Sequence, residues 1–369
     1  MKKIKIDIPF FISIAILVIG GFLIFTSASL GLLSNQSVKY ANVSFNQTFF
    51  GLFLGIIACI ITSNFDFKKY RKYAFYFFCV AIVVTLLVFV PKIGIQHGGA
   101  YRWIDLGATT FQPSELLKIA YIIYLAAWLA SVKDRVATMR YGFIPFIIIT
   151  SIVGIVLLKQ PDTDTFAITF FAGIAMFIAG GGKWRYFFIL LFSGIIGLGI
   201  IAYERPYVMS RITTFLHPSE NSLGSGYQIQ QSLIAIGSGG LSGRGFGQSI
   251  QKFNYLPEPI GDSIFAVASE EFGFLGAVGI IFLFIFFAFR GLKIATHTPD
   301  TFGRLLTVGI VIMIVSQAFV NIAAMVGVLP LSGITLPFIS HGGTALFMVL
   351  AEVGIILNIS KTAKLSAKK

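Results

Sequence analysis

Residues 253–289 read FNYLPEPIGDSIFAVASEEFGFLGAVGIIFLFIFFAF, and this stretch indicates the class of the protein. From residue 264 to residue 289 the chain is almost wholly apolar, which is long enough for a membrane-crossing helix of roughly 17–25 residues. Carboxylates at the edge of a membrane span are costly, and they point to function. The stretch places four of them near the start of the apolar run: Glu258, Asp262, Glu270 and Glu271.

The composition of the whole chain agrees with a membrane protein. Only 12 % of the 369 residues are charged, whereas soluble domains carry about 25 %. We therefore expect an all-α membrane protein with ten transmembrane helices, which form a single polytopic domain over residues 1–369. The apolar segments of spanning length are residues 8–30, 47–64, 73–91, 113–132, 142–158, 165–181, 187–203, 264–289, 305–327 and 341–360.

The basic residues are unevenly divided between the loops. Most of the 28 Lys and Arg residues fall in segments on the same side as the N-terminus, and the positive-inside rule makes that side cytoplasmic. Both termini are therefore expected in the cytoplasm, and residues 204–263, between helices 7 and 8, are expected to form a long extracytoplasmic loop. Basic residues spread in this way do not form the patch of a nucleic-acid-binding domain, so no nucleic-acid partner is expected.

The long loop contains GYQIQQSLIAIGSGG at residues 226–240. Ile229, Leu233 and Ile236 have helical spacing there, which predicts a helix on or dipping into the membrane surface. The glycine-rich run that follows, residues 237–247, lacks the G-K-[ST] ending of a phosphate-binding loop. It predicts flexible backbone that bends near a ligand.

Other ionisable residues lie in or beside the spans, and each leaves two interpretations open. Glu115 and Lys118 are three residues apart and share a helix face, either as a mutually neutralising pair or as a polar site with Arg102 nearby. Asp162 belongs either to a solvated turn or to a site. Glu352 has no local partner in the last span, and a hydrogen bond within the bundle explains it as well as function does.

Cations in the extracytoplasmic segments are contrary to the positive-inside rule, so some of them are expected to bind an anion. A lipid-linked phosphate or pyrophosphate would lie at this depth. Asp262 would then act as a base, because partial burial raises the pKa of a carboxylate, or it would only cap the eighth helix. The outer cations are Arg102, Lys118, Arg205, Arg211, Arg244 and Lys252.

Four stretches together resemble the SEDS family (shape, elongation, division and sporulation), the FtsW and RodA proteins. They are YRWIDLGATTFQPSELLKIA at 101–120, KQPDTDTFAI at 159–168, residues 226–277, and NIAAMVGVLPLSGITLPFISHGGTAL at 321–346. The order of the stretches and the ten-span frame match as well. The resemblance covers nearly the whole chain.

The resemblance implies an enzyme that polymerises lipid II on the outer face of the bacterial cytoplasmic (inner) membrane. Asp262 would be the general base that deprotonates the acceptor 4-hydroxyl, and undecaprenyl pyrophosphate would leave with inversion. A divalent cation, Mg²⁺ or Mn²⁺, is expected at the pyrophosphate, although the sequence shows no ligand set for it, and no organic cofactor is expected. With Arg211 added from the outer cations, the expected substrate-binding residues are Arg102, Glu115, Lys118, Asp162, Arg211, Gln231, Ser232 and Ser340.

Three positions depart from the family pattern. Asp164 stands where the family usually has Gly, His341 stands where it has Tyr, and Ile260-Gly261 precede Asp262 in place of His-Thr. These departures leave Asp262 as the acid, but help from a neighbouring His cannot be assumed.

The stretch GFGQSIQKFNYLPEP at 245–259 resembles the division-type FtsW more than the elongation-type RodA. The expected partners are therefore a class B penicillin-binding protein and other divisome proteins. Two alternatives of other classes are a lipid II flippase or transporter, and a divisome scaffold without activity. A transporter would gather its acids at the membrane midplane, whereas a polymerase would place them in an outward cavity.

Overall fold

The structure is a computed structural model that describes residues 6–34, 37–97, 100–105, 107, 109–217 and 225–363. In this part of the chain, nine helical segments are long and apolar enough to cross a membrane, and α7 is an apolar helix of 17 residues. The expected ten-helix membrane fold is therefore confirmed. The helices are α1 (Ile8–Ser29), η1 (Leu30–Ser34), α2 (Ser37–Phe45), η2 (Asn46–Phe53), α3 (Leu54–Asn64), α4 (Phe67–Leu86), η3 (Leu87–Phe89), α5 (Pro113–Val132), η4 (Lys133–Ala137), η5 (Met139–Phe143), α6 (Ile144–Lys159), α7 (Thr163–Ala179), α8 (Trp184–Glu204), α9 (Pro206–Leu216), α10 (Ser225–Ser238), α11 (Ile264–His297), α12 (Thr301–Met325) and α13 (Gly343–Ser360).

Local sequence signals set several helix starts. Asp7, Asp66 and Asp300 each cap a helix by accepting a hydrogen bond from a backbone N–H of the first turn. Pro113 occupies the first turn of α5, where its missing N–H costs nothing. Three of the few carboxylates in the chain therefore have a structural role at helix ends.

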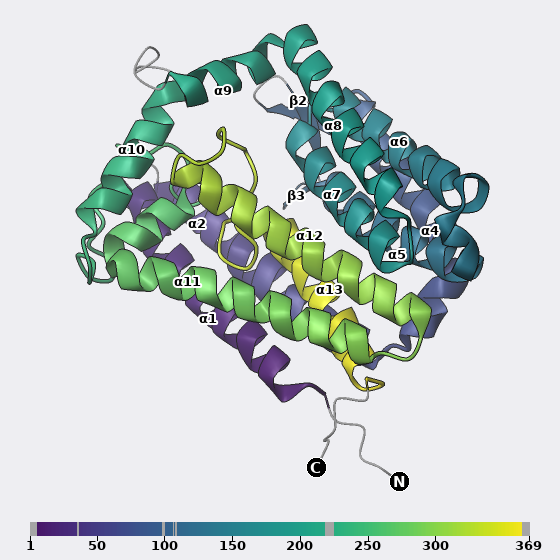
Figure 1. The fold of residues 1–369 in the computed structure, drawn as a ribbon. Coiled ribbons are helices and arrows are strands. Elements are labelled where there is room, and N and C mark those ends of the chain that lie inside the picture. Colours follow the sequence, from purple (N-terminus) through teal and green to yellow (C-terminus); the bar gives the residue numbers. More distant parts are fainter. Residues whose placement is uncertain are drawn as a thin grey trace.

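Three helices, α5, α12 and α13, form the centre of the bundle. In each of these helices, 67–72 % of the most apolar 18-residue stretch is buried inside the protein. In α8, which lies at the periphery, the buried share is 17 % (Figure 1). In a membrane, close packing and hydrogen bonds associate helices, because lipid tails are as apolar as the side chains. Gly354 shows this close packing, since a Cβ there would lie 2.0 Å from Thr62 Oγ1 on α3.

The first and last spans begin and end at the same end of the bundle, as an even number of spans requires. The Asp7 N–H donates to Ser360 Oγ at 3.2 Å, and Arg290 pairs with the Asp7 carboxylate at 2.5 Å. We call this the terminal end. The opposite end, formed by α9, α10, residues 326–342 and a small sheet, is the loop end (Figure 1).

The small sheet is the main departure from the all-α expectation. Strands β1 (Gly94–His97), β2 (Ala100–Asp105) and β3 (Thr110–Phe111) pair antiparallel in that order. Strands this short carry almost no alternating pattern, so the sequence showed only a long loop at 92–112. The sheet matters for the site because β2 carries Arg102.

The described part of the loop at 204–263 contains two helices, α9 and α10, of which only α10 was predicted. Figure 1 shows α8, α9 and α10 running in sequence around the loop end. Ile229, Ser232 and Ala235 form the buried side of α10. Leu233 is 45 % exposed, and the position of α10 at the membrane surface stays a prediction.

The glycine-rich run packs against a break in α11. Gly273 has φ 66° and ψ −165°, which interrupts the helix. The N–H groups of Arg244 and Gly245 donate to the carbonyls of Glu270 and Glu271 at 3.0 and 2.9 Å, and the N–H of residue 274 donates to the carbonyl of residue 240 at 2.8 Å. A Cβ on Gly273 would lie 2.3 Å from the N atom of residue 243. Close approach to α11 explains Gly239 and Gly243, because a Cβ on either would lie 2.1 Å from a carbonyl oxygen of α11. The expected bend of the run near a ligand stays a prediction.

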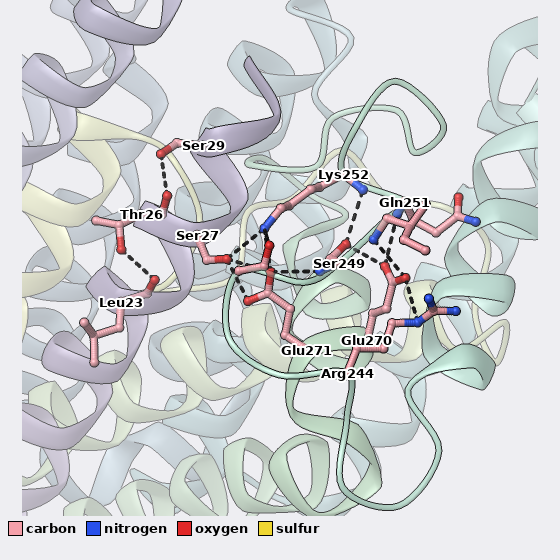
Figure 2. Close-up of polar contacts among 12 residues, drawn as sticks. Leu23, Thr26, Ser27, Ser29, Arg244, Ser249, Gln251, Lys252, Glu270 and Glu271 are labelled. Carbon is pink, nitrogen blue, oxygen red and sulfur yellow. Dashed lines mark hydrogen bonds and ion pairs between the residues drawn. The ribbon is translucent and has the colours of Figure 1, made fainter. Parts of the chain in front are cut away.

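Glu271 is the centre of a buried cluster that joins α11 to α1 and to the long loop (Figure 2). Lys252 Nζ lies 2.7 Å from Glu271 Oε1 and donates to Ser27 Oγ at 3.0 Å. Ser27 Oγ donates to both Glu271 oxygens at 2.6 and 2.7 Å. Lys252 is therefore a structural cation, and the expected anion binding falls to other outer cations.

Glu270 binds the next part of the loop. Ser249 Oγ and the N–H groups of residues 250 and 251 donate to its carboxylate at 2.5, 3.1 and 3.2 Å. Arg244 Nε lies 3.3 Å from the same carboxylate. Both acids therefore hold the loop on α11, and Arg244 also has a structural partner (Figure 2).

Candidate functional site

A polar cavity of about 460 Å³ opens at the loop end. Its wall is built from β2, from α5 and α12, and from the segments that precede α7, α11 and α13. Five of the nine expected catalytic and substrate-binding residues line it together: Arg102, Glu115, Lys118, Asp162 and Asp262.

Asp262 lies in a turn that α12 and the segment before α13 hold in place. Asn321 Nδ2, on α12, donates to the Asp262 carbonyl at 2.8 Å. Ser340 Oγ donates to the carbonyl of residue 261 at 2.7 Å, and the His341 N–H donates to that of residue 260 at 2.7 Å. The backbone on both sides of the carboxylate is therefore bound to the rest of the bundle.

The surroundings of Asp262 favour its protonated form more than water does. Burial raises the pKa of Asp262 from 3.8 to about 6; a hydrogen bond from Gln228 opposes this rise, and the charge of Glu258 adds to it. Among the described residues, none forms a hydrogen bond with Asp262 Oδ1, which is buried. A carboxylate with one oxygen unengaged and a pKa near neutrality is suited to accept a proton.

Arg102 connects the sheet to the turn before α7. Its guanidinium donates to the carbonyl of Gln160 at 3.2 Å and to that of Pro161, and it lies 4.0 Å from Asp162 Oδ1. Burial raises the pKa of Asp162, and the Arg102 charge opposes this rise. Arg102 remains partly exposed to the cavity, so part of its charge is available to an anion.

Lys118 and Glu115 form a buried ion pair on the cavity wall. Lys118 Nζ lies 2.8 Å from Glu115 Oε1 and donates to Gln317 Oε1 at 3.0 Å. Glu352, buried on α13, lies within electrostatic range of both. In the described part of the chain, Glu352 Oε2 meets no donor. The pair is therefore both a neutralising pair and a part of the cavity wall.

The comparisons with known proteins give the family. The profile of a family described as cell cycle protein, FtsW/RodA/SpoVE, matches residues 8–365. The chain belongs to this family. It is the SEDS family that the sequence motifs resemble.

Members of the FtsW/RodA/SpoVE family are similar to this chain over most of its length. Stage V sporulation protein E of Bacillus subtilis is 38 % identical over 337 residues, which cover 89 % of this chain and 92 % of that protein. A probable peptidoglycan glycosyltransferase FtsW of Geobacter is 39 % identical over 307 residues, or 83 % of this chain and 84 % of that one.

Solved structures of other proteins have the same fold. A chain of a peptidoglycan synthase complex, studied for the coordination of polymerization and crosslinking, has a TM-score of 0.80 and 25 % identity. The match covers 98 % of this chain and 99 % of that chain. The rod shape determining protein RodA of Thermus thermophilus has a TM-score of 0.71 at 24 % identity, over 99 % of this chain and 100 % of that one.

Four of the expected substrate-binding residues do not line the polar cavity. Arg211, on α9, pairs with Asp164 at 2.7 Å. Ser232 is buried and donates to the carbonyl of Gln228 at 2.8 Å. Gln231 lies partly exposed on α10, and Ser340 positions the Asp262 turn through its hydroxyl.

Gln317 and Asn321 are functional candidates that were not predicted from the sequence. Gln317 accepts from Lys118 and donates to the carbonyl of Thr335 at 3.1 Å, and Asn321 binds the Asp262 carbonyl. Both are amides within the apolar span 305–327. Polar residues inside a span are a recognised signal of function, so this pattern could have found them.

The expected divalent cation has no preformed protein site among the residues that the structure describes. No group of three His, Cys, Asp or Glu side chains there could hold a metal ion. Asp262 and Asp162 each contribute a carboxylate to the cavity, and Mg²⁺ often takes one or two carboxylates together with substrate phosphates. The cation stays a prediction, and no step below depends on it.

Proposed function

We propose that this chain is a peptidoglycan glycosyltransferase that polymerises lipid II at the outer face of the bacterial cytoplasmic membrane. The observation that carries the proposal is the convergence of Asp262, Arg102 and Lys118 on one cavity at the loop end. A base and two cations suit a reaction in which a hydroxyl loses a proton while an anionic group departs. The names of the FtsW relatives support the same activity.

In the proposed reaction, Asp262 accepts the proton of the acceptor 4-hydroxyl. The hydroxyl oxygen forms a bond to the anomeric carbon of the donor sugar from the face opposite the leaving group. The bond from that carbon to the pyrophosphate oxygen breaks, and undecaprenyl pyrophosphate leaves with the electron pair. The configuration of the sugar is therefore inverted.

The cations stabilise the charge that grows on the departing pyrophosphate. Arg102 is held by the carbonyls of residues 160 and 161, and Lys118 by Glu115 and Gln317, so both are positioned before substrate arrives. Preorganised charges of this kind need no rearrangement in the transition state. Asp162 and Glu115 act as partners that hold these cations.

The cellular setting extends the proposal. The chain would work as a single multi-pass domain, with both termini in the cytoplasm and the polar cavity facing outward. A class B penicillin-binding protein would cross-link the product, and the similarity to a chain of a peptidoglycan synthase complex supports such a partner. The FtsW-named relatives favour a role in division, together with other divisome proteins, over a RodA-type role in elongation.

Reconstitution tests this function directly. The purified chain is placed in liposomes with lipid II, with and without the partner, and products are separated by size. Glycan polymer is the expected product. If lipid II moves across the bilayer but no polymer forms, the chain is a transporter. If neither polymer formation nor movement is detected, the remaining assignment is a scaffold without activity.

Removing the buried pair at the cavity should weaken substrate use without unfolding the protein. In Glu115→Gln/Lys118→Met both charges are lost together, so neither is left buried alone. Loss of a hydrogen bond to a charged group costs about 1.5–3 kcal/mol, so kcat/KM should fall roughly 10–100-fold. The measurement is the initial rate of polymer formation at low lipid II.

The matched control removes another ion pair at the opposite end. Asp7→Asn/Arg290→Met acts at the terminal end and should leave kcat/KM close to that of the wild type. Equal losses in the two double variants would mean that the cavity pair has no particular role in substrate binding.

A further inference from the structure

A buried amide lies in the π-helix η2, next to the wall of the polar cavity. The first residue of η2, Asn46, lines the cavity, and π-helical turns are frequent at functional sites. The next residue, Gln47, is only 1 % exposed, and it was not among the site residues predicted from the sequence. A buried amide finds its hydrogen-bond partners within the protein, so the partners of Gln47 indicate what it does.

The π-helix packs against the start of α13 with backbone close to backbone. A Cβ on Gly343 would lie 2.9 Å from the carbonyl oxygen of Asn46, and a Cβ on Gly51 would lie 3.2 Å from the Cα atom of Gly343. Small residues on both sides permit this close approach. As a result, the side chain of Gln47 reaches the turn that precedes α13.

Gln47 holds this turn through both ends of its amide group. Its Nε2 donates to the carbonyl of Ser340 at 3.2 Å, and its Oε1 accepts from the N–H of Gly342 at 2.9 Å. Ser340 Oγ also accepts from the N–H of Leu336 at 2.8 Å, which fixes the direction of the hydroxyl. One side chain therefore binds the backbone on both sides of His341.

The same turn holds the segment that carries Asp262. Ser340 Oγ and the N–H of His341 donate to the carbonyls of the two residues before Asp262, each at 2.7 Å. The connection from Gln47 to this segment therefore runs through the 340–342 backbone and a single further layer of hydrogen bonds. A displacement of the turn before α13 would move the carboxylate of Asp262.

We propose that Gln47 is a positioning residue for the carboxylate of Asp262. This rests on the proposed function for the role of Asp262 as the base. A base must lie within hydrogen-bond reach of the hydroxyl that it deprotonates, and a displacement of about 1 Å costs on the order of 10²-fold in rate. Gln47 does not line the cavity, so it acts on the chemical step and not on the binding of lipid II.

The first test compares Gln47→Met with the wild type in the liposome assay. Methionine has nearly the length of glutamine, but its thioether donates no hydrogen bond and accepts only weakly. We expect kcat for polymer formation to fall about 10–100-fold, while KM for lipid II stays within about twofold. A raised KM with unchanged kcat would assign Gln47 to substrate binding and overturn the proposal.

Asn358→Leu is the matched control. At the terminal end, Asn358 forms a clamp of the same kind, since its Nδ2 donates to the carbonyl of Ser63 at 2.7 Å and its Oδ1 accepts from the N–H of Phe67 at 3.1 Å. The variant should lose stability as Gln47→Met does and keep the kcat of the wild type. Equal losses of kcat in the two variants would mean that Gln47 only stabilises the fold.

A milder variant serves if Gln47→Met does not fold. Gln47→Glu keeps the acceptor for the N–H of Gly342 and loses only the donor to Ser340. It should lower kcat less than Gln47→Met and leave KM unchanged. Absence of folded protein from both variants would assign Gln47 to the fold alone and overturn the proposal.

A double-mutant cycle tests the connection itself. Ser340→Ala removes the hydroxyl that joins the turn to the residue before Asp262, and it leaves the backbone groups that Gln47 binds. If the two residues act through one connection, kcat of Gln47→Met/Ser340→Ala should lie within about twofold of that of Gln47→Met. Losses that multiply would show independent effects and overturn the proposal.

Hydrogen exchange needs no activity, so it separates the failure of this proposal from that of the proposed function. The N–H groups of residues 261 and 263 donate to the carbonyl of Glu258. They should exchange about tenfold faster in Gln47→Met than in the wild type and Asn358→Leu. Faster exchange in a chain that makes no polymer would retain the connection to Asp262 and reject the glycosyltransferase. Normal exchange and normal kcat in Gln47→Met would retain the enzyme and reject the positioning role.

Discussion

Asp262→Asn is expected to lower the rate of glycan polymerisation about 10²–10⁴-fold, the usual contribution of a general base. The amide has nearly the shape of the carboxylate but accepts no proton at neutral pH. The turn that carries Asp262 is held through backbone groups by Asn321, Ser340 and His341, so the variant should fold. The measurement is kcat with lipid II in liposomes.

Asp105→Asn is the matched control for this variant. It makes the same chemical change at the loop end, on an exposed residue of β2 that does not line the cavity. Its rate should equal that of the wild type. Polymerisation by Asp262→Asn at the same rate as Asp105→Asn would remove Asp262 from the reaction.

Glu271→Gln is expected to destabilise the protein by about 3–5 kcal/mol, because it leaves the Lys252 ammonium buried without its charge partner. The change also weakens the two bonds from Ser27. Lys252 is fully buried, so water cannot take the place of the carboxylate. The measurement is the free energy of unfolding of the purified protein in detergent.

Restoring charge balance should restore stability. Glu271→Gln/Lys252→Met removes both ions, and loss of a whole buried pair is often close to neutral. Asp300→Ala removes only the cap of α12 and should lower the free energy of unfolding by about 1 kcal/mol. It is the reference against which the destabilisation by Glu271→Gln is compared. If Glu271→Gln costs no more than Asp300→Ala, the buried cluster does not hold the loop on α11.

Most of the fold follows from the length and spacing of the apolar segments. The predicted span 113–132 coincides with α5, because Pro113 marks one end and the charged residues at 133–135 mark the other. The span at 264–289 extends further, to His297, since Arg290 can remain helical while it pairs with Asp7. The three-stranded sheet could not be predicted, because its strands are too short to show a period of two.

The site was harder to predict from the sequence alone than the fold. Arg102, Lys118 and Asp262 lie far apart in the chain. Their expected position on the outer side suggested an anion site with a base, and the family resemblance gave each residue a role. No local pattern shows which acid a cation faces in the fold. Lys252 and Arg102 therefore seemed equivalent, although one is fully buried against Glu271 and the other lines the cavity.

The pH dependence of kcat/KM for lipid II tests the central claim most directly, because it reports the pKa of the base in the free enzyme. Asp262 must be deprotonated to act, and burial raises its pKa to about 6. Activity should therefore fall about tenfold for each pH unit below this value. Glu258→Gln should move the midpoint to lower pH, and Gln228→Ala should move it to higher pH. A profile that is flat through this range, or a midpoint that neither variant moves, would contradict the assignment of Asp262 as the base.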